Sequence, residues 1–309
     1  MMLPYSVRLV CLCLACFGLV QVFAGLIVSA LANRAIALAG RLPARSAAGL
    51  LLGIRLLPAG ASLVAILVLC LPSYFLLEED AASEPVSWLC IAAALVGASV
   101  LAIGLARGVR ALLRSPRVGR PAAIRIAGEE CCLVDSAQPM LVLTGVFRAR
   151  LLLSPPVLRA LPANELSVAL SHERAHRISR DNLKRLLLRL APLPLPTLDR
   201  AWSKYAEWAA DDAAVHGDAN RSLALASALV RFARLNAPGW PLPLASSLFG
   251  EEGGLAARVE RLLAAPTPVP ADFPRWLPLA AAAGLLAILL HPASLALAHR
   301  LLESLITGY

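Results

Sequence analysis

The segment His172-Glu173-Arg174-Ala175-His176 combines two imidazoles and a carboxylate at a spacing that suits a metal ion. On an α-helix, residues four apart lie one turn above each other on one face. His172 and His176 could therefore hold one Zn²⁺, whose bonds to imidazole nitrogen are about 2.0–2.1 Å long. Glu173 lies at the edge of that face, where it would take a proton from a water activated by the metal. The alternative is a surface helix with two chance histidines.

A catalytic zinc site also needs a third protein ligand and an open position. The histidines outside the motif are His216, in a turn, and His291 and His299, near the C-terminal apolar segment. We therefore expect Glu207, on a helix after the motif, to be the third ligand. Asp211, one turn later, would accept a hydrogen bond from the second nitrogen of a bound histidine. The alternative for this pair is a solvated acidic face.

The elements that position these residues are predicted from apolar periodicity. The motif lies on a helix that begins near residue 163, and a β-hairpin with a Thr144-Gly145 turn precedes it. Predicted helices cover residues 163–179, 181–190, 198–215, 222–235 and 255–264, and predicted strands cover residues 123–126, 132–134, 140–143 and 146–153. The amphipathic helix over 181–190 could lie on a membrane surface, but core packing is the commoner use of such a stripe.

The rest of the chain is too apolar for a soluble protein of this size. It has 309 residues, 59% of them hydrophobic, with a mean hydropathy of +0.71. A bilayer span needs roughly 20 apolar residues, and four stretches meet that need: 9–32, 56–77, 86–106 and 276–296. The first is too long for the apolar region of a usual signal peptide. We expect a mainly α-helical integral membrane protein with a soluble α+β domain over residues 107–273.

The net charge of +9 is distributed in a way that predicts topology. Arginines occupy the loop 33–55 and the stretch 107–125, whereas the loop 78–85 is acidic. By the positive-inside rule, the N-terminus lies outside and the domain over 107–273 lies in the cytosol. The arginines then face lipid headgroups, and no DNA-binding motif accompanies them, so we expect no nucleic-acid partner. The Arg- and Ala-rich composition favours a bacterial cytoplasmic membrane.

Seven cysteines are present, and their placement predicts no disulfide framework. Five fall in the apolar stretches, where a thiol behaves as a small hydrophobic group. Cys131 and Cys132 are adjacent, without the residues that usually separate metal-binding cysteines. We interpret them as structural.

Several motifs together resemble the BlaR/MecR family of membrane metallopeptidases. The zinc motif at 172–176 is followed by Arg180-Asp181-Asn182 and then by Glu207-x-x-Ala210-Asp211. The strand-like run Gly145–Leu153 and the segment Arg258–Leu263 also look like those that flank the motif in that family. Three spans, a cytosolic domain and a fourth span follow the family's order, so the resemblance covers most of the chain. The motifs are also similar to those of the HtpX-type membrane proteases.

The resemblance implies a gluzincin fold, a zincin type in which a second helix supplies an acidic zinc ligand. It also implies that the strand over Val146, Phe147, Arg148, Ala149 and Arg150 pairs with an extended peptide by strand addition. Asp181 would have a structural role or would support a ligand. Family members inactivate a transcriptional repressor, sometimes with self-cleavage, so the implied partners are a protein substrate, a cytosolic repressor, a second copy or a separate sensor protein.

The sequence also departs from that family. Members that sense β-lactams carry a large extracellular domain after the last span, whereas here only residues 297–309 follow it. Direct drug sensing is therefore not expected. Candidates for stabilising the oxyanion of the reaction are Tyr205, His216 and Arg221. Two other functions remain open: an HtpX-like protease for membrane-protein quality control, and a non-catalytic membrane signalling scaffold.

Overall fold

The computed structural model describes residues 4–77, 86–115, 123–235, 246–247 and 254–264, with six single positions beyond residue 290. The described chain is mainly helical, with one small mixed sheet. The acidic loop predicted over 78–85 and nearly all of the fourth predicted span lie outside the described residues.

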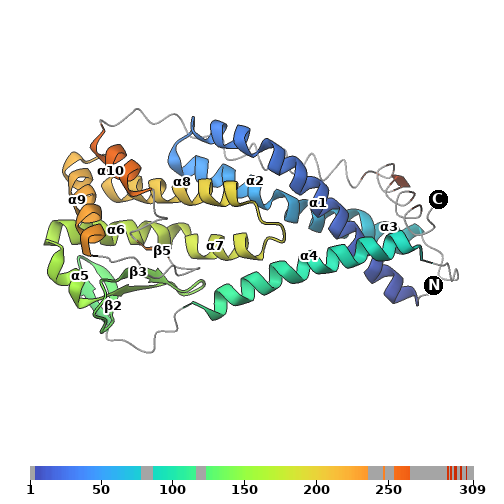
Figure 1. The fold of residues 1–309 in the computed structure, drawn as a ribbon, viewed down its shortest axis with the longest axis horizontal. Helices are drawn as coiled ribbons and strands as arrows, with labels where there is room; N and C mark the ends of the chain where they lie inside the picture. The colour runs from blue at the N-terminus through green and yellow to red at the C-terminus, as the bar shows by residue number, and fades with distance from the viewer. Residues whose placement is uncertain are drawn as a thin grey trace.

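Long apolar helices form the narrow half of an elongated molecule (Figure 1). They are α1 (Tyr5–Ala39), α2 (Ala44–Val64), which continues through the π-helical η1 (Ala65–Cys70) into α3 (Leu71–Leu77), and α4 (Trp88–Leu113). Within the described residues, three helices are long and apolar enough to cross a membrane, which confirms this property for the first three predicted spans. Their outer faces carry large apolar side chains, such as Phe23 at 69% exposure, as expected of a surface that faces lipid.

The sheet lies in the other half and has the strand order β1-β2-β4-β3-β5. Its strands are β1 (Ala123–Ile126), β2 (Glu129–Leu133), β3 (Leu141–Thr144), β4 (Arg150–Leu153) and β5 (Ser246–Ser247). β2 and β4 are parallel, and the other pairs are antiparallel. The β3–β4 pair confirms the predicted antiparallel pairing, but Thr144 belongs to β3 and residues 145–149 form the connection, so the predicted Thr144-Gly145 turn is wrong. Gly145 follows β3 with a φ of 91°, a conformation that favours glycine.

Helices complete the half of the molecule that carries the His172–His176 motif. They are α5 (Pro155–Ala160), α6 (Ala163–Ser179), α7 (Asp181–Leu190), α8 (Pro196–Val215), α9 (Ala219–Leu235) and α10 (Leu255–Leu263). Among them, α6 packs against β3 and β5. The prolines Pro155 and Pro156 start α5, where the sequence predicts only a break, because proline is tolerated in the first turn of a helix. One apolar core joins β3 and β4 to α6 and α9.

The basic loop predicted over 33–55 is almost entirely helical. α1 continues to Ala39 and α2 begins at Ala44, so only residues 40–43 connect them. The prediction assumed that each helix ends where the apolar run ends. The extra turns instead pack against α8 in a shared apolar cluster that includes Ala47, and this packing keeps them helical.

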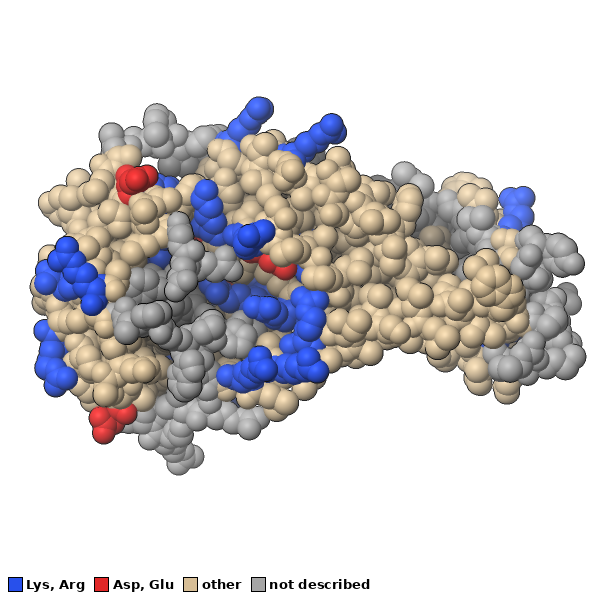
Figure 2. Space-filling model, in the orientation of Figure 1, with Lys and Arg blue, Asp and Glu red and all other residues tan. Residues whose placement is uncertain are grey.

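The hairpin formed by α7 and α8 projects between the long helices, with α1 and α2 on one side and α4 on the other (Figure 1). Arg55 of α2 is buried and pairs with Asp199 of α8 at 2.6 Å. Arg107 of α4 donates to the carbonyls of Ala191 and Pro192 at the hairpin tip. Leu188 of α7 joins the apolar cluster between α2 and α8, so α7 packs in the core as expected. Figure 2 shows basic side chains gathered where the two halves of the molecule meet.

Candidate metal centre

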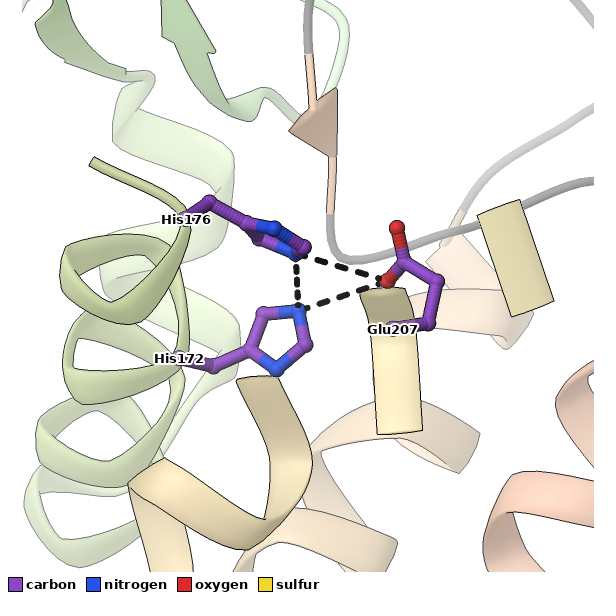
Figure 3. Close-up of side chains that lie close together, drawn as sticks. All are labelled: His172, His176 and Glu207. Carbon is purple, nitrogen blue, oxygen red and sulfur yellow. Dashed lines mark hydrogen bonds and ion pairs between the residues drawn. The ribbon is translucent and has the colours of Figure 1, made fainter. Parts of the chain in front are cut away.

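The His172–His176 motif lies in the last two turns of α6 and faces the interior. His172, Glu173 and His176 are each 0% exposed. The apolar turns before them, which include Leu170, belong to the core and hold this part of the helix in place. The Nε2 atoms of His172 and His176 lie 3.1 Å apart and point to the same place (Figure 3).

A left-handed residue at the end of α6 turns the chain back toward the motif. Arg180 has a φ of 56°, ends α6 and directly precedes α7. The following residue, Asp181, accepts a hydrogen bond from Nδ1 of His176 at 2.7 Å, which leaves Nε2 of this ring to face the site. Asp181 also pairs with Lys184 at 2.8 Å. The structure therefore places Asp181 as a support for a histidine, in line with the role that the resemblance implies.

The third residue of the centre comes from α8. Oε2 of Glu207 lies 3.5 Å from Nε2 of His172 and 3.6 Å from Nε2 of His176 (Figure 3). Asp211, one turn later, places Oδ1 at 3.0 Å from Nδ1 of His172, although the angle falls outside that of a hydrogen bond. The two helices thus bring together the three predicted ligands and Asp211, one of the two predicted supporting carboxylates.

The distances within this group fit a metal ion. Ligand atoms about 2.0–2.2 Å from one tetrahedral ion lie about 3.3–3.6 Å apart, and the three separations here are 3.1, 3.5 and 3.6 Å. Oε2 of Glu207 is buried and makes no hydrogen bond within the described chain. The guanidinium of Arg258 lies 3.2 Å from this oxygen and supplies one positive charge there. Because the three separations fit one ion, His172, His176 and Glu207 could hold a metal ion.

Local charges shift the pKa values of these groups strongly. Burial lowers the pKa of His176, but the Glu207 carboxylate and the hydrogen bond to Asp181 outweigh it and raise that pKa to about 10. Burial raises the pKa of Glu207, yet the His176 charge and the hydrogen bonds to both histidines hold it well below its usual range. Both directions express the mutual attraction between the Glu207 carboxylate and the protonated ring of His176, to which the positive charge of Arg258 adds.

Glu173 lies beside the ligands without joining them. Burial raises the pKa of its carboxyl to about 7. Within the described chain, neither of its carboxylate oxygens makes a hydrogen bond. A carboxyl group with a pKa near neutrality can both accept and return a proton, which is what a general base requires.

Arg258 of α10 is a further buried residue of this site, and we did not predict it. Its guanidinium forms a double hydrogen bond with Asp211, at 2.6 and 2.9 Å, and lies 3.2 Å from Oε2 of Glu207. It is 3% exposed. The sequence carried a signal, because Arg258 interrupts the apolar stripe formed by Leu255, Val259 and Leu262. A cation on the buried face of an amphipathic helix requires acidic partners.

A cleft of about 490 Å³ opens beside His176. The loop between β3 and β4 forms one wall, and the junction of α6 and α7 forms the other. Asn182 holds the two walls together, because its amide donates to the carbonyls of Leu143 and Gly145, both at 2.9 Å. Any molecule that reaches the metal ligands from this side passes along these walls.

The predicted substrate strand differs from what the structure shows. Residues 146–149 form the loop that lines the cleft, and only Arg150–Leu153 is a strand. That strand pairs with β2 on one side and β3 on the other, so it has no open edge for a peptide. Strand addition at β4 is therefore wrong. The edge next to the cleft belongs to β3, and β5 already pairs with it in antiparallel fashion.

The structure gives the three oxyanion candidates other contacts. Tyr205 packs in the apolar cluster between α8 and the long helices. His216 is an exposed residue at the end of α8. Arg221 donates to the carbonyl of Ala214 and to Ser171, and so ties α9 to α8 and α6. Among the described contacts, none joins these three residues to the metal ligands.

Comparison of the chain with protein-family models, with curated proteins and with solved structures gives no match.

Proposed function

We propose that this protein is a membrane-embedded zinc endopeptidase. The observation that carries the proposal is the convergence of three buried ligand atoms from α6 and α8, with the carboxyl of Glu173 beside them. Two histidines one turn apart plus a glutamate from a second helix form a ligand set typical of zinc peptidases. The proposed structural class is accordingly a gluzincin.

Zinc bound there would polarise the scissile carbonyl and lower the pKa of an attacking water. Glu173 would take the proton of that water and pass it to the leaving amine, which its pKa of about 7 suits. Asp181 and Asp211 would hold the two imidazoles in orientation, through the contacts to Nδ1 of His176 and His172. Arg258 would keep Glu207 and Asp211 ionised, since it contacts both.

An extended protein segment is the proposed substrate. This edge of β3 pairs with an antiparallel strand, β5 of the same chain, through Leu143 and Val142, and a substrate strand would take the place of β5. Main-chain pairing of this kind would bind many sequences in the extended form that peptidases require. The presence of a segment of the same chain on this edge favours self-cleavage as one reaction of the enzyme.

The proposed location is a bacterial cytoplasmic membrane, with the metal centre on the cytosolic side and a fourth span over residues 276–296. The gathering of basic side chains at the junction of the two halves supports this orientation (Figure 2). A role in signalling, by cleavage of a repressor or of the enzyme itself, follows from the resemblance to the BlaR/MecR family. The competing role is HtpX-like quality control of membrane proteins.

Metal content and cleavage, measured on the full chain in detergent, test the activity. We expect about one zinc per chain and cleavage of unfolded casein by the wild type. Glu173→Gln should keep the zinc and lose about 10²–10⁴-fold in rate, whereas His172→Ala and Glu207→Ala should lose the zinc. Undiminished cleavage by Glu173→Gln would sink the mechanism. A wild type that binds no zinc after reconstitution would favour a non-catalytic scaffold.

A further inference from the structure

The walls of the cleft beside His176 carry an excess of positive charge. Arg148 lies on the β3–β4 loop, whereas Arg177 and Arg180 lie where α6 ends, and all three line the cleft. Arg177 is neutralised, because it pairs with Glu129 at 2.6 Å. Arg148 and Arg180 are exposed, and their guanidinium groups make no ion pair within the described part of the chain.

The nearby acids are already engaged with other groups. Glu129 binds Arg174 as well as Arg177, at 3.2 and 2.6 Å. Asp181, next to Arg180 in the chain, is 3% exposed and is held by His176 and by Lys184. The two free guanidinium groups therefore face the cleft and its solvent without a compensating carboxylate from these residues.

The main-chain positions of Arg148 and Arg180 are held by neighbouring contacts. Arg180 adopts the left-handed conformation that joins α6 to α7, so its position is set by the same turn that brings Asp181 to His176. Arg148 lies in the loop that Asn182 holds through the carbonyls of Leu143 and Gly145. The backbones of both arginines are thus held on the two walls of the cleft, which His176 also lines.

We propose that this cleft is a binding site for an acidic side chain of the substrate, recognised by Arg148 on one wall and Arg180 on the other. Guanidinium groups bind carboxylates through paired hydrogen bonds, and an unpaired cation near a cleft also attracts an anionic segment before contact. Phe147, which is 84% exposed on the same loop, offers an apolar contact beside the acid. The inference rests on the proposed peptidase function, since it names the kind of segment that the enzyme selects.

Binding to a catalytically inactive form tests this site without requiring cleavage. The protein is the full-length Glu173→Gln variant in detergent, loaded with zinc. The probes are two short fluorescent peptides of equal length, one with a central Glu-Glu pair and one with Gln-Gln in its place. We expect the Glu peptide to bind about tenfold more tightly, the size expected of two partly exposed ion pairs.

Two double charge-reversal variants are compared, one at the cleft walls and one outside the cleft. Arg148→Glu with Arg180→Glu should abolish the preference for the Glu peptide. Arg159→Glu with Arg234→Glu changes the net charge equally at exposed positions on α5 and α9, outside this cleft, and should retain the preference. Zinc content, measured for each variant, confirms that the centre is intact.

Equal binding of the two peptides, or no binding of the Glu peptide, overturns the proposal. Loss of the preference in both double variants overturns it as well, because the effect would then come from overall charge. Cleavage by the protein with Glu173 intact is measured in parallel. If the preference for the Glu peptide is retained but no cleavage occurs, the peptidase function is refuted and the acidic binding site stands. If cleavage occurs without that preference, the acidic binding site is refuted and the peptidase function stands.

Discussion

Replacing Asp211 with asparagine tests whether the metal centre depends on its supporting carboxylates. Asp211 is 0% exposed and contacts Nδ1 of His172 at 3.0 Å, while its other interactions go to Arg258. Asparagine keeps the shape and one oxygen of the side chain but removes the charge. The imidazole of His172 would lose the anion that orients it and makes its Nε2 a stronger ligand.

The expected effect on metal affinity follows from that single contact. Loss of a group that orients a ligating histidine typically weakens metal binding about 10–100-fold, which corresponds to about 1.4–2.7 kcal/mol. The neighbouring Asp212 provides a matched control. Its carboxylate is 48% exposed and pairs with Arg261 at 2.6 Å on the surface of the helix. Asp212→Asn removes the same charge one residue away and should change zinc affinity by less than about twofold.

Competition with a chromophoric zinc chelator measures both variants in the full-length protein. The assay reads the affinity of the folded protein, and circular dichroism confirms that each variant is folded. Equal losses of zinc affinity in the Asp211 and Asp212 variants would refute the reasoning, because overall charge and not the contact with His172 would then control binding. An unchanged affinity in Asp211→Asn would refute it as well.

Three further predictions concern packing around the site and between the long helices. Asn182→Ala leaves two buried carbonyls without their donor and should lower the free energy of unfolding by about 1–3 kcal/mol; a urea titration that shows no change would contradict this. Gly97→Ala should destabilise the protein by about 1–3 kcal/mol, because the new methyl group meets the backbone of α1. The control is Gly49→Ala, whose methyl group has no atom within contact distance and should stabilise the protein by about 0.5–1 kcal/mol. Thermal unfolding in detergent compares the two variants. The thiols of Cys13 and Cys70 lie 3.8 Å apart, so a mild oxidant should link α1 to η1, and absence of that disulfide in peptide mapping would show that the two helices pack differently.

The sequence predicted the parts of the site that local spacing controls. His172 and His176 face the same place because a helix brings residues four apart together, and their shared face follows from spacing alone. Glu207 and Asp211 were predicted as an acidic pair one turn apart on a later helix, because few other histidines could supply the third ligand. The sequence also predicted α6 and α7 with their observed bounds, since Arg180-Asp181 interrupts one apolar stripe and starts another.

Contacts between distant segments were harder to predict. The partner of Arg258 depends on how α10 crosses α8, and nothing in the spacing of 47 residues between Arg258 and Asp211 indicates that crossing. Which strand lies at the edge of the sheet depends on the strand order. The parallel pairing of β2 with β4 makes β4, the end of the predicted substrate strand, an inner strand of the sheet. The predicted loop over 33–55 is helical for a similar reason, which the sequence does not reveal. Packing against α8 keeps α1 and α2 helical beyond the ends of their apolar runs.

The two faces of α8 give the metal centre an unusual dependence on the rest of the chain. One face carries Glu207, while the other buries Leu198, Trp202 and Tyr205 against α1 and α2. A fragment that began at residue 123 would expose this apolar face to water and would lose the wall that supports a ligand helix. The half with the His172–His176 motif therefore needs α1 and α2 to cover the apolar face of α8. Attempts to prepare this half as a soluble fragment should yield aggregates, and the proposed catalytic unit is the whole chain, including helices that do not contact the candidate metal ligands.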